Sequence, residues 1–230
     1  MALYDYLGNV IATGGSGGTS PIAGKRIALI GDSNTQYNGA EFKAYMEETY
    51  GCTFIPLGTA GYAWETQSAD GVNTMDASAV GRVNAIVAKA DSSKLITEYD
   101  VILFMMGTNC YSLGEITDTS DNVNTLCGAM RYCMEKMCYY GRKIPIGVII
   151  PIRSDGTKGK YELPDRFQAI EQIANEFNVP VLNLYKEGRI IDNSMTPDGN
   201  SYYLGDSVHL GANGTIQLER IMGKWIAYSL

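Results

Sequence analysis

The sequence predicts an α/β fold, a three-layer α/β/α sandwich built on a five-stranded parallel sheet. Two observations lead to this prediction. Five short apolar runs alternate with longer segments whose apolar residues recur at helical spacing. The third run, residues 101–106, is apolar at every position, which is typical of a strand covered on both faces. Strands that alternate with helices in this way form a parallel sheet with a layer of helices on each side.

The individual elements can be placed along the chain from these patterns. The apolar runs predict strands at residues 26–30, 53–57, 101–106, 144–150 and 179–184. Stripes of apolar residues three and four positions apart predict helices at residues 38–50, 79–90, 121–140, 164–177 and 212–228. Gly51 is placed to end the first helix and Pro164 to begin the fourth, because glycine favours helix C-termini and proline favours first turns.

The first 22 residues differ in composition from the rest of the chain. They contain the tract GGSGGTSP, and Gly/Ser-rich segments behave as flexible coil. We therefore expect residues 1–22 to form a flexible arm or linker and residues 23–230 to form one folded domain. The arm either tethers the domain to a larger assembly or is a disordered tail. It has no basic start and no continuous apolar core, so we do not expect a signal peptide.

Length and composition exclude several classes of protein. The 230 residues suit a single domain, and 45% hydrophobic and 19% charged residues are typical of a globular chain. A net charge of −7 without a Lys/Arg cluster disfavours nucleic-acid partners. No apolar run approaches the roughly 20 residues that span a bilayer. The sequence leaves open a homo-oligomer, and a location in the cytoplasm or in a phage or cell-surface assembly.

The cysteines and the tyrosines indicate which metal sites, disulfides and ligands to expect. Five cysteines are an odd number, and they include neither a CxxC pair nor a neighbouring histidine. This pattern argues against a disulfide framework and against a zinc site, so we expect no metal. The 16 tyrosines suit polar ligands such as sugars, because each combines a flat apolar face with a hydroxyl, although they also suit ordinary interfaces.

Polar and glycine-rich loops follow the first three predicted strands. They are Gly-Asp-Ser-Asn at residues 31–34, Gly-Thr-Ala-Gly at residues 58–61 and Gly-Thr-Asn at residues 107–109. A fourth segment, residues 206–209, stands just before the last helix. Ligands of open α/β sheets bind outside the carboxyl ends of the strands, so we expect these four segments to form one site.

Ser33 and His209 are the residues in these segments that suit nucleophilic catalysis. A serine hydroxyl needs a base within hydrogen-bond reach, and His209 is the only histidine in the chain. Asp206 precedes it by three residues, a spacing that lets both side chains lie on one side of a turn. A carboxylate there would hold the imidazole tautomer and stabilise the imidazolium.

These segments together resemble the SGNH, or GDSL-type, hydrolase family. The resemblance covers about residues 25–230 and rests on IALIGDSNT, the glycine of GTAGYAWET, MMGTN in place of GxND, and DSVHLGANG in place of DxxH. It implies a flavodoxin-like fold, an esterase without metal or cofactor, and a catalytic triad of Ser33, Asp206 and His209. It also implies an oxyanion hole formed by Ser33, Gly61 and Asn109.

Some of these residues also have structural interpretations, and one position departs from the family. Ser33 could cap a helix, Gly61 could be a turn glycine and Asn109 an ordinary loop residue. A glycine that lets backbone approach closely and a side-chain NH₂ nevertheless suit the binding of an oxyanion. Cys110 stands where the family usually has an aspartate that helps to order this loop.

The substrate is less defined than the reaction. Aromatic residues near the motifs can stack on sugar rings, although tyrosines near a site are often part of the packing: Tyr37, Tyr62, Trp64, Tyr111, Tyr202 and Tyr203. Of these we expect Tyr62, Trp64 and Tyr111 to bind the substrate. No long apolar lid segment is visible. The expected substrate is therefore a small-molecule or glycan ester, most simply a short acetyl ester on a carbohydrate. The alternatives are a lipase, lysophospholipase or thioesterase of the same family, or a tethered glycan-binding or structural module with little activity.

Overall fold

The structure is a computed structural model of the chain. It describes residues 3–4, 10–12, 20–66, 75–152, 164–188, 190, 201–204, 206 and 208–230. Within these residues the main sheet has five strands in the order β4-β3-β5-β6-β7, and all neighbouring pairs are parallel. The strands are β3 (Arg26–Gly31), β4 (Thr53–Gly58), β5 (Val101–Met105), β6 (Ile146–Ile150) and β7 (Val181–Asn183). The order is that of flavodoxin-like folds, which confirms the predicted fold class.

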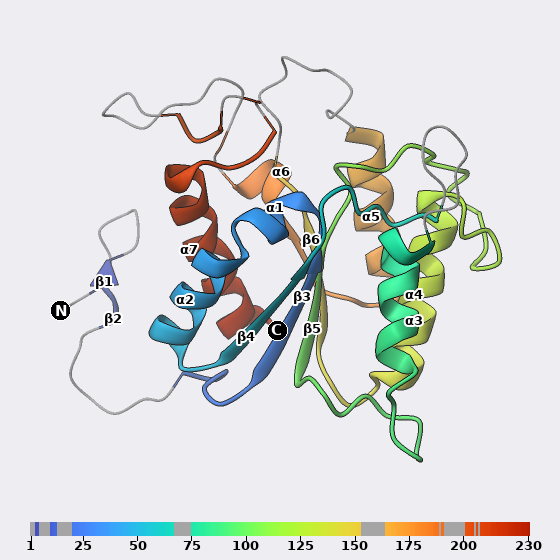
Figure 1. Cartoon of the computed structure of the whole chain (residues 1–230), viewed down its shortest axis with the longest axis horizontal. Coiled ribbons are helices and arrows are strands. Elements are labelled where there is room, and N and C mark those ends of the chain that lie inside the picture. Colours follow the sequence, from blue (N-terminus) through green and yellow to red (C-terminus); the bar gives the residue numbers. More distant parts are fainter. Residues whose placement is uncertain are drawn as a thin grey trace.

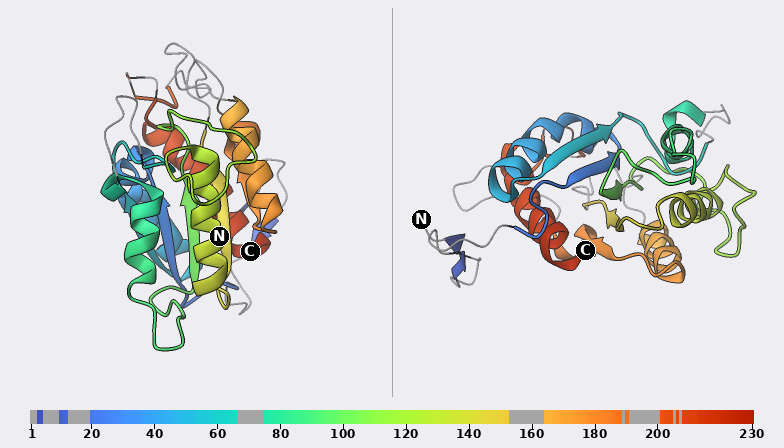
Figure 2. Two further views of the ribbon diagram at one scale, coloured as in Figure 1. Left: turned by 90° about the vertical axis from the view of Figure 1, so that its right-hand side faces the viewer. Right: turned by 90° about the horizontal axis from the view of Figure 1, so that it is seen from below.

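Helices cover both faces of this sheet. In Figure 1, α2 and α7 lie on one side of the strands, and α3, α4 and α5 lie on the other. The end-on view in Figure 2 shows the same three layers. The helices are α1 (Ser33–Tyr37), α2 (Gly39–Tyr50), α3 (Ala79–Val87), α4 (Leu126–Tyr140), α5 (Pro164–Glu176), α6 (Leu184–Glu187) and α7 (Ala212–Ser229), with a 3₁₀ turn at Met75–Ala77.

Strand β5 shows why the sheet is buried on both sides. Its residues alternate between two apolar cores: Ile102 and Phe104 join the core under α3, α4 and α5, whereas Leu103 and Met105 join the core under α2 and α7. Successive side chains of a strand point to opposite faces, so a central strand needs apolar residues at every position. The uninterrupted apolar run at residues 101–106 of the sequence therefore marks β5 as the middle strand of the sheet.

Several elements begin later than the sequence predicts: α2 at Gly39 rather than residue 38, β7 at Val181 rather than residue 179, and two for which the physical cause is clear. Helix α4 begins at Leu126 rather than at residue 121, because the hydroxyl of Thr125 accepts a hydrogen bond from the amide of Gly128 and caps the helix. Strand β6 begins at Ile146 rather than at residue 144. Pro145 precedes it and has no amide hydrogen, and the amide of Ile144 donates instead to Gly141 in a turn.

Parts of the N-terminal segment are also described. β1 (Leu3–Tyr4) and β2 (Val10–Ala12) pair as a small antiparallel sheet. Most of the Gly/Ser tract lies outside the described residues, so the division into an arm and a domain stays a prediction. Ile22 is buried in the core under α2 and α7, which places packed structure before residue 23. No helix in the described part of the chain is long and apolar enough to cross a membrane.

Candidate active site

Ser33 lies at the start of a short helix that turns sharply away from β3. The carboxylate of Asp32 accepts a hydrogen bond of 3.0 Å from the amide of Asn34 and so caps α1. Gly31 allows the turn to be tight, since a Cβ atom there would collide with the side chain of Thr35. Ser33 therefore stands at the carboxyl edge of the sheet and is 8% exposed.

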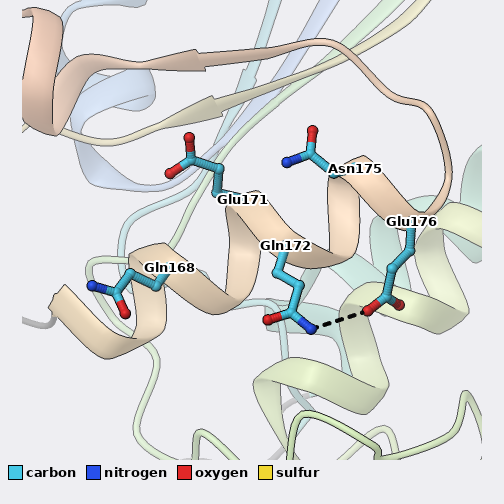
Figure 3. A pocket seen from close by; sticks show the side chains of 5 residues that line it. All are labelled: Gln168, Glu171, Gln172, Asn175 and Glu176. Carbon is cyan, nitrogen blue, oxygen red and sulfur yellow. Dashed lines mark hydrogen bonds between the residues drawn. The ribbon is translucent and has the colours of Figure 1, made fainter.

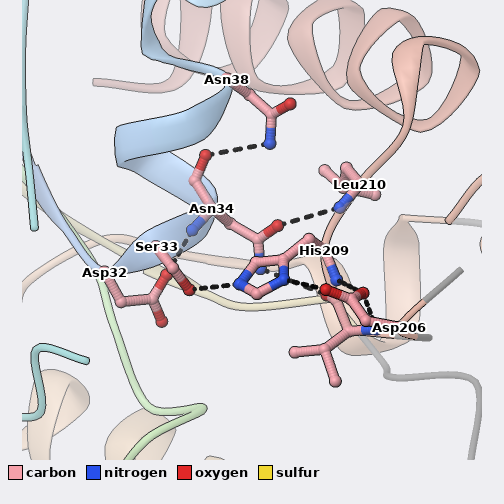
Figure 4. Close-up of polar contacts among 8 residues, drawn as sticks. Asp32, Ser33, Asn34, Asn38, Asp206, His209 and Leu210 are labelled. Atoms are coloured by element: carbon pink, nitrogen blue, oxygen red, sulfur yellow. Dashed lines mark hydrogen bonds and ion pairs between the residues drawn. The ribbon is translucent and has the colours of Figure 1, made fainter. Parts of the chain in front are cut away.

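The side chains of Ser33, His209 and Asp206 form one hydrogen-bonded chain, which Figure 4 shows in a single view. The Nε2 atom of His209 lies 2.8 Å from the Oγ atom of Ser33. On the opposite side of the ring, Nδ1 lies 2.5 Å from Oδ2 of Asp206. With the proton on Nδ1, Nε2 has a lone pair directed at the serine hydroxyl, which is the arrangement required for a general base.

Asp206 is held as an anion by its own segment. Its Oδ1 atom accepts hydrogen bonds of 3.0 Å from the amides of both Val208 and His209. Partial burial would raise the pKa of Asp206, but the hydrogen bonds from the His209 ring and from the two amides outweigh burial and lower the pKa to about 2. The carboxylate is therefore charged at neutral pH and can stabilise a protonated imidazole.

Asn34 connects the turn that carries Ser33 to the segment that carries His209. Its Oδ1 atom accepts a hydrogen bond of 3.1 Å from the amide of Leu210, and its Nδ2 atom donates to the carbonyl of Val208 at 3.4 Å. These two contacts hold the backbone on either side of His209. Asn34 was not among the predicted site residues, although its place directly after Ser33 was the available signal.

Asp32 lies directly before Ser33, at the N-cap of α1. Its side chain is buried, and burial raises its pKa to about 6. The amide of Asn34, the charge of His209 and the hydroxyl of Thr108 act in the opposite direction. Asp32 does not touch the hydroxyl of Ser33 in any described contact, and its hydrogen bond to Asn34 makes it part of the turn that presents the serine.

The register of the sheet places the three motif loops at the same carboxyl edge of the sheet. Gly31 of β3 is paired with Gly58 of β4 and with Met105 of β5. The loops after these three strands therefore leave neighbouring strand ends. The side chain of Asn109 reaches the second loop, where its Nδ2 atom donates to the carbonyl of Tyr62 at 3.1 Å. An amide nitrogen carries two hydrogens, so a second one is available for a ligand.

Gly61 has the backbone freedom that an exposed donor requires. Its φ angle is +80°, in the left-handed region that favours glycine, and it is exposed. The preceding residue, Ala60, donates its amide to Oε1 of Gln36 at 2.5 Å, which ties this loop to the end of α1. Within the described residues, the amide of Gly61 has no acceptor.

The prediction that Trp64 stacks on a substrate is wrong. Its side chain is 0% exposed, lies stacked on Phe104 in the core and donates from Nε1 to the carbonyl of Met106. Tyr62 is also nearly buried, with its hydroxyl donating to the carbonyl of Asp76 at 2.6 Å. Tyr111, in contrast, is 52% exposed on the loop that follows Asn109.

Tyr37 is a further aromatic residue at the site. Its ring meets the ring of His209 edge to face, with 4.9 Å between the ring centroids, and more than half of the side chain is exposed. It lies four residues after Ser33, at the end of α1. A hollow between α2 and α7 begins at Tyr37 and includes Leu204 and Ile216.

A second hollow lies elsewhere and contains none of the predicted site residues. It lies along α5 and is lined by polar side chains, two of which, Gln172 and Glu176, are hydrogen-bonded (Figure 3). Among the described residues, no group of three or more His, Cys, Asp or Glu side chains is arranged to hold a metal ion.

Comparisons of sequence and of structure give different results. No protein-family model matches the sequence, and no curated protein matches it. The structure is similar to that of a protein from Lactobacillus plantarum, with a TM-score of 0.69, 22% identity, and coverage of 91% of this chain and 100% of the other. It is also similar to a protein from Bacteroides ovatus described as a GDSL-like lipase, with a TM-score of 0.58, 15% identity, and coverage of 89% and 98%.

The acetylxylan esterase Axe2 from Geobacillus stearothermophilus is a further structural relative. Its TM-score is 0.58 at 14% identity, with coverage of 90% of this chain and 97% of the esterase. Each of these similarities extends over almost the whole of both chains. The chain therefore has the fold of the SGNH, or GDSL-type, hydrolases.

Proposed function

We propose that the protein is a serine esterase that hydrolyses carboxylic esters through an acyl-enzyme on Ser33. The observation that carries this proposal is the hydrogen-bonded chain from the Ser33 hydroxyl through both nitrogens of His209 to the Asp206 carboxylate. The chain shares the SGNH-type fold with structural relatives described as a GDSL-like lipase and an acetylxylan esterase. This shared fold supports the same reaction class.

The first half-reaction transfers the acyl group to the enzyme. His209 takes the hydroxyl proton of Ser33 on Nε2 while Oγ forms a bond to the ester carbonyl carbon. The carbonyl oxygen becomes an oxyanion, for which the Ser33 amide, the Gly61 amide and the Asn109 side chain are the proposed donors. When the intermediate collapses, the bond to the alcohol oxygen breaks, and the imidazolium returns its proton to that oxygen.

The second half-reaction releases the acid. A water molecule gives its proton to Nε2 of His209 and attacks the acyl carbon. The bond to Oγ then breaks, and Ser33 recovers its proton from the imidazolium. Asp206 stays ionised throughout and stabilises the protonated ring in both steps, which its low pKa favours.

The proposed substrates are short acyl esters, above all acetyl groups, on carbohydrates. Tyr37 and Tyr111 expose aromatic faces beside the triad and on the Asn109 loop, where a sugar ring can stack. The relation to an acetylxylan esterase points to the same substrate class. Hydrolysis of longer acyl esters is the second candidate, and the structural relative described as a GDSL-like lipase favours it.

The proposal is tested by measuring hydrolysis of p-nitrophenyl acetate by the wild type and by Ser33→Ala. The wild type is expected to turn over and the variant to lose activity. Glycan binding without turnover in the wild type would instead favour a non-catalytic module. A series of acyl esters from acetate to decanoate, with acetylated xylan and acetylated amino sugars, then defines the substrate. An optimum at C8 or longer would contradict the sugar-acetyl assignment.

A further inference from the structure

Glu65 is a carboxylate in an unexpected place. It follows Trp64 in the segment after β4, and its side chain is 0% exposed. Burial raises its pKa, while contacts with the Cys110 thiol and with nearby backbone amides hold that rise back. Burying a carboxylate is costly unless its oxygens receive hydrogen bonds. A residue of this kind in the interior calls for a reason other than packing.

The partners of Glu65 all belong to the loop that carries Asn109. Its Oε1 atom accepts hydrogen bonds from the amides of Tyr111, at 2.5 Å, and Ser112, at 3.3 Å. The Cys110 thiol is also close to the carboxylate, and it accepts the amide of Trp64 at 3.4 Å. Every residue from Cys110 to Ser112 is thus held by the Trp64–Glu65 segment.

These contacts lie directly beside the proposed oxyanion donor. Asn109 precedes Cys110, and its side chain donates to Tyr62, which belongs to the same segment after β4. Two adjacent loops are therefore joined at successive positions, with Glu65 providing the only carboxylate in the described contacts between them. Position 110 itself offers a thiol, which is a weak hydrogen-bonding group.

We infer that Glu65 is a positioning residue that fixes the 109–112 loop, and hence the Asn109 side chain, from the neighbouring loop. A carboxylate at position 110 would act on this loop locally, and here Glu65 supplies the acceptor from a distance. The inference rests on the proposed esterase function, because it assigns to Asn109 a role in binding the oxyanion. Displacing a fixed donor by as little as 1 Å can cost roughly 100-fold in rate.

A purely structural role for Glu65 makes a different prediction from a positioning role. Replacing a buried charge by an apolar side chain of similar volume is often neutral or stabilising. Glu65→Met preserves volume but removes the acceptor, whereas Glu65→Gln keeps an acceptor oxygen. We expect Glu65→Met to lose about 30-fold or more in kcat, with KM for p-nitrophenyl acetate changed less than about threefold. Glu65→Gln is expected to keep kcat within about threefold of the wild type.

The matched control is the next residue. The hydroxyl of Thr66 is also buried, but it hydrogen-bonds to Val123 and Asn124, near the far end of the connection between β5 and α4. Thr66→Val is expected to lower the melting temperature while leaving kcat within about twofold of the wild type, since it touches no part of the 109–112 loop. An equal loss of kcat in Thr66→Val and Glu65→Met would overturn the inference.

A double variant tests whether the carboxylate can be moved. In Glu65→Met/Cys110→Asp, the new aspartate can accept the amide of Ser112 two residues ahead, as in an Asx-turn. We expect it to recover at least tenfold of the kcat lost in Glu65→Met, although Cys110→Asp alone places two carboxylates together and destabilises the protein. Failure of the double variant to recover kcat, with the protein folded, would contradict the inference.

A measurement that does not depend on turnover separates this inference from the proposed function. The side-chain amide resonances of Asn109 in a ¹⁵N–¹H NMR spectrum are expected to shift in Glu65→Met and to stay in place in Thr66→Val. Unchanged Asn109 resonances in Glu65→Met would overturn the positioning role whatever the activity. If the Asn109 resonances shift in Glu65→Met while the wild type hydrolyses no ester, the positioning of Asn109 is upheld and the esterase function is rejected.

Discussion

The side-chain oxygen of Asn34 accepts a hydrogen bond of 3.1 Å from the backbone amide of Leu210, 176 residues further along the chain. Asn34 directly follows the proposed nucleophile, and Leu210 directly follows the proposed base. Together with the bond from Asn34 to the Val208 carbonyl, this contact fixes the backbone that carries His209. One buried amide side chain thus links the turn that carries Ser33 to the backbone on both sides of His209.

We expect Asn34→Ala to lower kcat by about 10- to 100-fold with little change in KM, because the base moves relative to the serine. Asn34→Asp keeps the acceptor for Leu210 but loses the donor for Val208, so its kcat should fall between those of the wild type and Asn34→Ala. Steady-state kinetics on p-nitrophenyl acetate measure both. Wild-type kcat in a folded Asn34→Ala would show that His209 is held by other contacts.

Asn109→Ala tests the proposed oxyanion hole. Loss of one such donor typically lowers kcat by about 100- to 1000-fold, equivalent to roughly 3–4 kcal/mol of transition-state stabilisation. The side chain is partly exposed, and its described hydrogen bond is to the Tyr62 carbonyl, so the variant should still fold. Turnover is measured together with thermal unfolding. Near-normal turnover would remove Asn109 from the site.

The raised pKa of Asp32 should make the stability of the folded protein depend on pH. This pKa rises from the usual 3.8 to about 6 on folding, so the folded state binds this proton more tightly than the unfolded state does. The resulting stabilisation is complete below about pH 4 and is lost as the pH rises to about 6, an effect on the order of 3 kcal/mol. Urea unfolding at pH 4 and pH 7 should show a larger loss in the wild type than in Asp32→Asn, since the raised pKa of Glu65 adds the same dependence to both proteins. The same pH dependence in both proteins would contradict the raised pKa.

Tyr111 and Trp64 are expected to differ in their effects on substrate binding. Tyr111→Ala removes an exposed ring and should raise KM for acetylated sugars several-fold, with KM for p-nitrophenyl acetate little changed. Trp64→Phe removes a buried hydrogen bond and should lower stability by about 1–3 kcal/mol without raising KM. If Trp64→Phe raised KM and Tyr111→Ala did not, the assignment of Tyr111 as the substrate-stacking residue would be refuted.

The sequence predicted the sheet and the proposed catalytic residues for related reasons. Buried parallel strands require continuous apolar runs, and the run at Val101–Met105 was therefore recognisable. Ser33 and His209 were recognisable because chemistry restricts the residue types that can serve and because the chain has one histidine. The distances between the side chains of Ser33, His209 and Asp206, by contrast, depend on segments far apart in the sequence.

Other features of the site could not be predicted from local patterns. Trp64 and Tyr111 lie three and two residues after Gly61 and Asn109, but only packing determines that one ring enters the core and the other reaches solvent. Glu65 interrupts the otherwise weakly polar stretch GTAGYAWET, and that charge was the available signal of a buried contact. Its partners, the amides of Tyr111 and Ser112, become visible only when two loops are placed side by side.

The central claim is that His209 activates Ser33 as a nucleophile, and covalent labelling with a fluorophosphonate tests it most directly. Mass spectrometry should find one adduct, on the peptide that contains Ser33, in the wild type. Ser33→Ala should show no adduct, and His209→Ala should react slower by at least about 100-fold, because the hydroxyl then has no base. An unlabelled wild type, or labelling of His209→Ala at the wild-type rate, would contradict the claim.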